Sequence, residues 1–239
     1  MSNLLTVEKA NFFIGQLQVL RDISLNIAKN ESIMLIGRNG AGKTSTLKTI
    51  MGLYTLTSGR IIFDGVDITK IPAHQRASKL GIAYSPEDSK VFPDLTVEEN
   101  IKMGIWLAGN KKNDDKDIME TILNIFPEIK RLMKRKGIYC SGGEKKMVSV
   151  ARALALRPKL ILLDEPLEGL APVVVQRFKK ALTDIENMGI SLLITESNVN
   201  TALSLNRKTL VIERGEIIYE GEPSEILKRE DIYRIVRGV

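Results

Sequence analysis

An octapeptide that follows a short apolar run constrains this chain more than any other feature of its sequence. Residues 37–44 read GRNGAGKT and fit the pattern G-x-x-x-x-G-K-[ST], and the preceding residues 33–36 are all apolar. Where a strand precedes such a loop and a helix follows it, the glycines let backbone N–H groups point at phosphate oxygens, and the helix dipole adds positive charge. The sequence therefore predicts a phosphate-binding loop between a buried strand and a helix.

The polar residues of this loop have expected roles. We expect Lys43 to reach the β- and γ-phosphates of a nucleotide, and the hydroxyl of Thr44 to bind Mg²⁺. The expected ligands of the loop are therefore the phosphates of a nucleotide, together with Mg²⁺. The predicted phosphate-binding residues are Gly37, Arg38, Asn39, Gly40, Ala41, Gly42, Lys43, Thr44 and Ser45.

The apolar runs of the chain predict two kinds of sheet. Three of them have the nearly continuous hydrophobicity of strands buried on both faces, and helical patterns follow each, so they predict a parallel sheet flanked by helices. Shorter β-rich runs near the N-terminus predict an antiparallel layer, and the tail predicts a hairpin before a terminal helix. The buried runs lie at 33–36, 160–163 and 190–194, the antiparallel ones at 5–8, 19–27 and 60–63, and the hairpin at 209–219.

The middle of the chain has a different pattern. Between Val97 and Leu156 we find no convincing buried strand, and a polar stretch at 109–117, GNKKNDDKD, is typical of a linker. We therefore expect one domain over residues 1–239 with a helical subdomain inserted at 88–156. The predicted fold class is α/β, a P-loop NTPase core with a mainly parallel sheet, an antiparallel β subdomain and an inserted helical subdomain.

The composition is that of a globular protein. Of the 239 residues 44% are hydrophobic, and no apolar run approaches the roughly 20 residues that cross a bilayer. The N-terminal residues lack the basic start and long apolar stretch of a signal peptide. The single cysteine, Cys140, cannot form an internal disulfide, which fits a reducing compartment. A net charge of +6 is more typical of a solvated basic surface than of a nucleic-acid site, so we expect no nucleic-acid partner.

A pair of carboxylates follows the second buried run. Residues 160–165 read LILLDE, so Asp164 and Glu165 come at the end of a predicted strand. A phosphate-binding loop needs a metal-binding carboxylate at the end of a neighbouring strand, and Asp164 is placed for that role. Glu165, one residue further on, is placed to polarise a water molecule that attacks the γ-phosphate.

A Ser-Gly-Gly sequence opens a helix ahead of these carboxylates. Ser141, Gly142 and Gly143 precede apolar residues at helical spacing, so their N–H groups and the serine hydroxyl form a second predicted anion site. Together with the phosphate loop and the Asp-Glu-Pro strand end, this segment resembles the signature motif of ABC-transporter nucleotide-binding subunits. The resemblance covers essentially the whole chain, and the motifs follow the order and spacing of that family.

Within the family, the chain looks most like the ATP-binding subunits of branched-chain amino acid importers. This likeness rests on residues 67–74, 91–100 and 169–172, which read DITKIPAH, VFPDLTVEEN and GLAP. Lipopolysaccharide-export ATPases are the next most similar group, through ITESNV at 194–199 and EPSEIL at 222–227.

The resemblance implies a motor subunit that binds and hydrolyses ATP at the cytoplasmic face of the cell membrane. Its expected partners are transmembrane permease subunits, a second ATP-binding subunit facing it head to tail and, indirectly, an extracellular solute-binding protein. In the family, the signature of one chain completes the phosphate site of the other. We expect the loop at 85–88 to carry motion to the permease, and Glu87, where the family usually has Gln, to bind Mg²⁺.

Several positions depart from the family pattern. An aromatic residue usually stacks on adenine just before a glycine in the first β-segment, but this chain has Ile14 there, so Phe13, its neighbour Phe12 and Ile14 are all candidates for the base contact. Where the family at large places a histidine against the γ-phosphate, this chain has Ser197, which is the candidate to position the attacking water. Ala171 stands where an aspartate is common.

These departures leave alternatives to a fully active motor. Ser197 and Ala171 also suit a regulatory module that closes on ATP and barely hydrolyses it. A soluble ABC ATPase that acts on ribosomes or DNA generally has two nucleotide-binding units or a long coiled-coil insertion, and this sequence has neither. A small-molecule kinase would leave the signature motif without a purpose. We expect a motor whose hydrolysis is slow, with Cys140 in a structural role.

Overall fold

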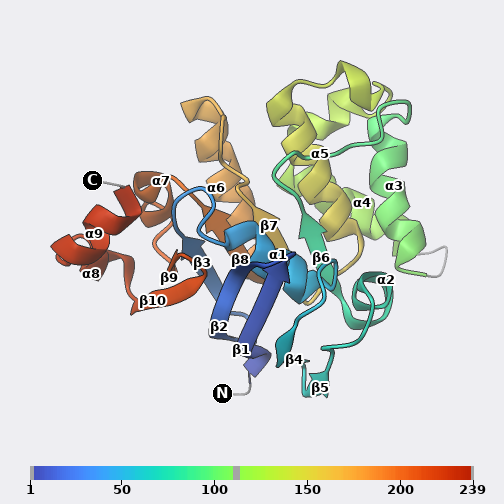
Figure 1. The fold of residues 1–239 in the computed structure, drawn as a ribbon. Coiled ribbons are helices and arrows are strands. Elements are labelled where there is room, and N and C mark those ends of the chain that lie inside the picture. Colours follow the sequence, from blue (N-terminus) through green and yellow to red (C-terminus); the bar gives the residue numbers. More distant parts are fainter. Residues whose placement is uncertain (1–2, 110–113, 238–239) are drawn as a thin grey trace. The chain divides into compact units, whose positions relative to one another are not determined.

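The computed structural model describes residues 3–109 and 114–237 (Figure 1), and the chain divides into two compact units. The first unit comprises Met1–Ala73 and Ser191–Val239, and the second comprises His74–Ile190. The expected single domain over 1–239 and the bounds 88–156 of an inserted helical subdomain stay predictions.

The first unit contains an antiparallel sheet in the strand order β2-β1-β4-β5. Along β2, buried and exposed residues alternate, as they do in strands with one face on a core. Leu20 and Ile23 belong to this buried face. The expected antiparallel layer is therefore present. Its strands are β1 (Asn3–Ile14), β2 (Leu17–Ala28), β4 (Ser58–Phe63) and β5 (Val66–Asp67).

A second set of strands in this unit leads into the predicted phosphate loop. Strand β3 (Ser32–Ile36) pairs in parallel with β8 (Ser191–Glu196) and with β9 (Lys208–Glu213), and β10 (Glu216–Gly221) pairs antiparallel with β9. Every residue of β8 is buried, as expected for a strand covered on both faces. The helices of this unit are α1 (Lys43–Met51), α7 (Val199–Leu203), α8 (Pro223–Ile226) and α9 (Glu230–Arg237).

The second unit combines a parallel strand pair with a group of helices. Strand β6 (Ile82–Ser85) pairs in parallel with β7 (Leu160–Asp164), whose residues are all buried. The longer helices are α3 (Val97–Leu107), α4 (Asp114–Ile125), α5 (Gly142–Ala155) and α6 (Pro172–Asn187). Shorter turns are α2 (Ala73–Gln75), where the two units divide in the sequence, the π-helical η1 (Arg76–Leu80) and the 3₁₀ turns η2 (Pro127–Leu132) and η3 (Gly137–Tyr139).

Close packing joins these helices. A Cβ atom added to Gly104 of α3 would lie 2.4 Å from the carbonyl oxygen of Arg152 in α5, so the two backbones approach closely. The rings of Phe126 and Phe178 pack at 5.8 Å between centroids and tie the end of α4 to α6. Within the described residues, no helix combines the length and the apolar character that a membrane span requires.

The prediction of a linker at 109–117 is wrong in its last part. Helix α4 begins at Asp114, so residues 114–117 are helical, while residues 110–113 lie outside the described part of the chain. Acidic residues at a helix N-terminus interact favourably with the helix dipole, and Ile118 beyond them is buried. The polar stretch is therefore in part the first turn of an amphipathic helix.

Candidate functional site

The predicted phosphate loop lies between β3 and α1. Gly40 and Gly42 have φ angles of +82° and +116°, in the left-handed region that favours glycine. Gly37 is required for a different reason, because a Cβ atom there would lie 2.3 Å from the carbonyl oxygen of Ile212 in β9. The glycines thus serve both the turns of the loop and its close approach to the neighbouring strand.

Lys43 folds back over this loop. Its side chain is only 4% exposed, and its Nζ donates hydrogen bonds to the carbonyl oxygens of Gly37 at 2.8 Å and of Arg38 at 3.1 Å. Gly42 is the N-cap of α1, and no side chain among the described residues caps this helix end. The positive end of the α1 dipole and a buried ammonium therefore lie on the same loop, an arrangement suited to a polyanion.

The turn between β9 and β10 supports the other side of the loop. The N–H of Gly215 donates to the carbonyl of Ala41 at 2.8 Å, and the N–H of Arg21 donates to the carbonyl of Gly215 at 2.8 Å. A hollow of about 290 Å³ lies beside this contact. Its lining residues are Arg38, Asn39, Gly40, Ala41, Glu213 and Arg214.

The candidates for an adenine contact lie at the end of β1 and differ in exposure. Phe12 is 8% exposed and stacks on the ring of Tyr54 at 4.7 Å between centroids, so its ring is part of the core. Phe13 and Ile14 are 39% and 55% exposed. The base contact remains a prediction for Phe13 and Ile14, whose side chains are accessible to a ligand.

Ser197 follows β8 directly and lies beside the start of the phosphate loop. In the pairing of β3 with β8, Ile36 is opposite Glu196, and the N–H of Gly37 donates to the carbonyl of Glu196 at 3.4 Å. Asn198, the next residue, caps α7, because its side chain accepts a hydrogen bond from the N–H of Thr201 at 3.0 Å. The pairing of β3 with β8 therefore places Ser197, the residue after Glu196, at the edge of the sheet where the loop begins.

The two predicted carboxylates end β7 and are both buried. Asp164 is 2% exposed and accepts a hydrogen bond from the hydroxyl of Tyr84 in β6, at 3.0 Å. Glu165 is 4% exposed and has a φ angle of +46°, which is unusual for a residue with a side chain. Its carbonyl oxygen accepts hydrogen bonds from the Nζ of Lys146 at 2.6 Å and from the N–H of Glu168 at 3.3 Å.

Glu87, in the loop after β6, belongs to the same group of acidic side chains. Loss of hydration raises the pKa of Glu87, and neighbouring carboxylates raise it further. These carboxylates belong to Glu168, Glu165 and Asp164, while the positive charge of Lys146 acts in the opposite direction. Burial is the larger cause of the raised pKa, and the neighbouring carboxylates add to it, so Glu87 is a partly desolvated carboxyl beside other acidic side chains.

The Ser-Gly-Gly segment forms the N-terminus of α5 as expected. Ser141 and Glu144 make a capping box, in which the serine Oγ accepts from the N–H of Glu144 at 3.3 Å and the glutamate Oε2 accepts from the N–H of Ser141 at 2.8 Å. A Cβ atom at Gly142 would meet no described atom within 4 Å. Cys140, just before, is buried, and burial followed by the charge of Glu144 raises the pKa of its thiol.

Comparison with known proteins agrees with this geometry. The profile of the ABC transporter family matches residues 20–168. A probable branched-chain amino acid transport ATP-binding protein, LivF, of Archaeoglobus fulgidus is 35% identical over 240 residues, which cover 99% of both chains. The chain belongs to the ABC transporter family.

Other relatives of this ABC subunit carry a different description. The lipopolysaccharide export system ATP-binding protein LptB of Haemophilus influenzae is 35% identical over 237 residues, 99% of this chain and 98% of the relative. A crystal structure of a nucleotide-free ATP-binding cassette from an ABC transporter superposes with a TM-score of 0.85 at 25% identity and covers 98% of both chains. The family and the fold class expected from the sequence are confirmed, and the chain is an ABC ATPase.

The structure groups the predicted site residues of the ABC ATPase by unit. The first unit contains the phosphate loop 37–45, Ser197 and the end of β1 with Phe13 and Ile14. The second unit contains the acidic residues and the Ser-Gly-Gly helix end. These second-unit residues are Glu87, Asp164, Glu165, Ser141, Gly142 and Gly143.

Two contacts within the second unit were not expected from the sequence of the cassette. Tyr84 carries no motif, and its hydrogen bond to Asp164 depends on the parallel pairing of β6 with β7. Lys146, two residues beyond Glu144 on α5, also belongs to no motif. Its ammonium donates a hydrogen bond to the carbonyl of Glu165 in the same chain. The sequence feature that could have predicted this contact is the position of Lys146, about one turn after Ser141 on a helix that packs near β7.

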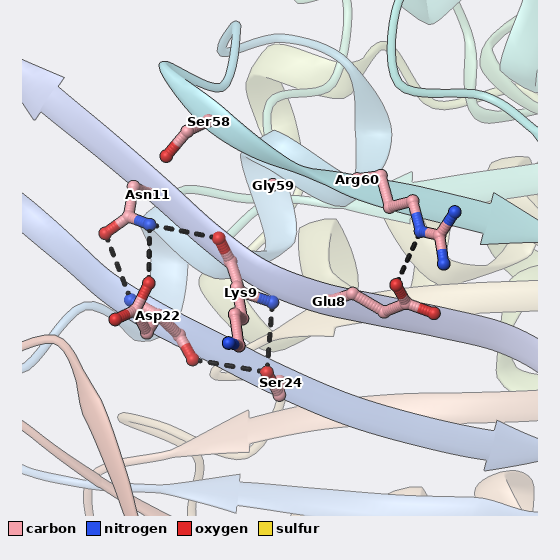
Figure 2. A pocket seen from close by; sticks show the side chains of 8 residues that line it. All are labelled: Glu8, Lys9, Asn11, Asp22, Ser24, Ser58, Gly59 and Arg60. Atoms are coloured by element: carbon pink, nitrogen blue, oxygen red, sulfur yellow. Dashed lines mark hydrogen bonds and ion pairs between the residues drawn. The ribbon is translucent and has the colours of Figure 1, made fainter.

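A larger hollow, of about 660 Å³, lies on the antiparallel sheet of the cassette (Figure 2). Figure 2 shows that its polar groups bond to one another: Asn11 Nδ2 donates to Asp22 Oδ1 at 2.8 Å and to the carbonyl of Lys9 at 3.0 Å, and the N–H of Lys9 donates to Ser24 Oγ at 3.0 Å. Lys9 and Asp22 both have positive φ, next to an irregularity in the pairing of β1 with β2. These bonds stabilise a β-bulge, and none of the predicted site residues lies here.

Proposed function

We propose that this ABC ATPase binds ATP on the loop 37–45 and hydrolyses it to drive transport through permease subunits. The observation that carries the proposal is the buried ammonium of Lys43, which is held over the loop by the carbonyls of Gly37 and Arg38. Triphosphate oxygens offer a polyanion that such a cation and the α1 N-terminus would bind. Phe13 or Ile14, exposed at the end of β1, would contact the adenine.

Mg²⁺ is the proposed metal cofactor, held by Thr44, Asp164 and Glu87. A hydroxyl and two carboxylates are oxygen ligands of the kind that Mg²⁺ prefers. The raised pKa of Glu87 fits this assignment, because a bound cation would offset the repulsion among the neighbouring carboxylates. When bound, Mg²⁺ supplies neutralisation of the negative charge on the β- and γ-phosphates.

Glu165 is the proposed general base. Its carboxylate would accept a proton from the water that attacks the γ-phosphate. Its burial supports this role, since water exclusion strengthens the interaction of a carboxylate with a bound water molecule. The hydroxyl of Ser197 would position that water or the γ-phosphate by donating a hydrogen bond.

The proposed working unit has two ATP-binding subunits, identical or different, facing head to tail on transmembrane permease subunits. Ser141, Gly142 and Gly143 would contact the nucleotide bound to the partner's loop, through the N-terminus of α5. The exposure of Ser141 and Gly142 supports this, because the segment is accessible to another chain. We place the subunit at the cytoplasmic face of the cell membrane, with a solute-binding protein as an indirect partner and no nucleic acid.

Branched-chain amino acids or related solutes are the proposed cargo. The support is the likeness to LivF and to the high-affinity branched-chain amino acid transport ATP-binding protein BraG of Pseudomonas aeruginosa, which is 36% identical over 224 residues. Lipopolysaccharide export is the second candidate, because LptB is equally similar. Co-purification with the permease encoded beside its gene, followed by ATP-dependent uptake of labelled leucine into proteoliposomes, separates the two. Export-type permeases and no leucine uptake would favour the second candidate.

Nucleotide binding to Lys43→Ala tests the ATPase proposal. Loss of the ammonium leaves the loop without its fixed cation, so we expect no measurable binding of ATP at micromolar concentrations while the circular dichroism spectrum stays unchanged. Lys29→Ala is the matched control, because Lys29 is a half-exposed lysine of the same unit whose partner is Asp64 on the surface. Undiminished ATP binding by Lys43→Ala would refute the assignment of the loop.

A further inference from the structure

The hydrogen bond between Lys146 and Glu165 joins the signature helix to the proposed general base. Lys146 is the fifth residue of α5, one turn beyond Ser141–Gly143, and its Nζ lies 2.6 Å from the carbonyl oxygen of Glu165. A hydrogen bond from a charged donor is roughly twice as strong as a neutral one. This short hydrogen bond therefore restrains the peptide group between Glu165 and Pro166.

The backbone at Glu165 needs such support. Its φ of +46° is in the left-handed region, which a residue with a side chain populates roughly 5- to 30-fold less readily than the right-handed one. Residues in this conformation persist only where the surroundings stabilise them, and they are frequent at functional sites. The N–H of Glu168 also donates a hydrogen bond to the carbonyl of Glu165, at 3.3 Å, which is longer than the 2.6 Å contact from Lys146.

The direction of the carboxylate depends on this conformation. In a β-strand, successive side chains point to opposite faces of the sheet. The left-handed backbone at Glu165, directly after β7, breaks this pattern, so the side chain of Glu165 points in a different direction from that of a residue in a continued strand. If the carbonyl were released, the backbone would relax and the buried carboxylate would lose its orientation. A base that is misplaced by about 1 Å can lose a hundredfold in rate.

We propose that Lys146 is a positioning residue for ATP hydrolysis, which holds Glu165 in its left-handed conformation through the Glu165 carbonyl. This inference rests on the proposed role of Glu165 as general base. It also links the helix that begins with the Ser-Gly-Gly segment to Glu165 of the same chain, through the side chain of Lys146 about one turn further along α5.

The test is steady-state and single-turnover hydrolysis of MgATP by the purified full chain carrying Lys146→Met. Methionine keeps the length of the side chain and a good helix propensity but removes the charge and the donor. We expect kcat to fall at least about tenfold, in line with loss of one charge-assisted hydrogen bond, while the KM for ATP stays within about twofold. Lys146→Arg, which keeps a charged donor, should retain kcat within about threefold.

Two further measurements separate positioning from general damage. Lys180→Met is the control, since Lys180 lies on α6 of the same unit, is mostly exposed and pairs with Asp184 on the surface; its kcat should equal that of the wild type. In a Glu165→Gln background, Lys146→Met should cause no further loss, because Lys146 acts through Glu165. If Lys146→Met does not fold, Lys146→Leu, which also lacks a donor, takes its place and should show the same loss of kcat at constant KM.

The outcomes distinguish this inference from the proposal it rests on. An unchanged kcat in Lys146→Met, a loss that appears only in KM, or a full additional loss in the Glu165→Gln background would overturn the positioning role. Rapid turnover by Glu165→Gln alone would instead remove Glu165 from the mechanism, whatever Lys146 does.

Discussion

Replacing Gly37 or Gly40 of the phosphate loop by alanine should reduce the stability of the protein by different amounts. Gly37 has no positive φ, but a Cβ atom there would lie 2.3 Å from the carbonyl oxygen and 2.9 Å from the Cγ2 of Ile212. Real Cβ atoms essentially never come within 3.0 Å of such neighbours, so Gly37→Ala must displace the loop or β9 by several tenths of an ångström. A Cβ atom at Gly40 would meet no described atom within 4 Å, so the only cost of Gly40→Ala is the strain of placing alanine at a φ of +82°.

The magnitudes follow from these two mechanisms. Overpacking against backbone costs about 1–3 kcal/mol, and because both atoms of Ile212 are too close we expect Gly37→Ala at the upper end, about 3 kcal/mol. An alanine forced into the left-handed region costs about 1–2 kcal/mol, which we expect for Gly40→Ala. In a chain of this size, 1 kcal/mol lowers the Tm by about 2–4 °C. Gly37→Ala should therefore lose roughly 6–12 °C and Gly40→Ala roughly 2–8 °C.

The assay is thermal and urea unfolding of both variants beside the wild type. ATP affinity, measured by titration calorimetry, should fall more in Gly37→Ala, because the carbonyl of Gly37 is one of the two that hold Lys43. Gly40→Ala as the more destabilised variant, or Gly37→Ala with a wild-type Tm, would refute the close approach of the loop to β9.

Two other residues give predictions of their own. Ser197→His should raise kcat at least about tenfold at unchanged ATP affinity, because the imidazole side chain is longer and reaches further toward the γ-phosphate. A wild-type kcat in the ordinary range of about 1–10³ per second, unchanged by this substitution, would contradict the expected slow hydrolysis. Cys140 should react slowly with a disulfide reagent at pH 7, since burial and Glu144 raise the pKa of its thiol, and the rate should climb as the pH rises above the usual range of a thiol. Equal reaction rates of the native and urea-unfolded chain at pH 7 would contradict that prediction.

The sequence was sufficient wherever one segment determines its own conformation. The apolar run before Gly37 is β3, the loop and its helix follow as predicted, and Ser141 caps α5 with a box that Glu144 completes three residues later. In each case neighbouring residues supply the constraint, as strand burial, glycine freedom or a capping pair.

Contacts between distant segments were not predictable in this way. The left-handed Glu165 and its bond from Lys146 depend on how α5 packs near β7, which no local pattern encodes. The choice among the rings at the end of β1 depended on Tyr54, which stacks on Phe12. The four polar residues 114–117 were interpreted as linker because their helix is defined by apolar residues that follow them.

The central claim is that this ABC ATPase hydrolyses ATP with Glu165 as the base, and Glu165→Gln tests it most directly. The amide keeps the size of the side chain but cannot accept the proton of the attacking water. ATP affinity and the single-turnover rate should be measured on the same preparation of the wild type and the variant. We predict an affinity within about threefold of the wild type and a rate at least about a hundredfold lower, with an ATP-bound dimer accumulating on gel filtration. A variant that hydrolyses ATP at the wild-type rate would contradict the account.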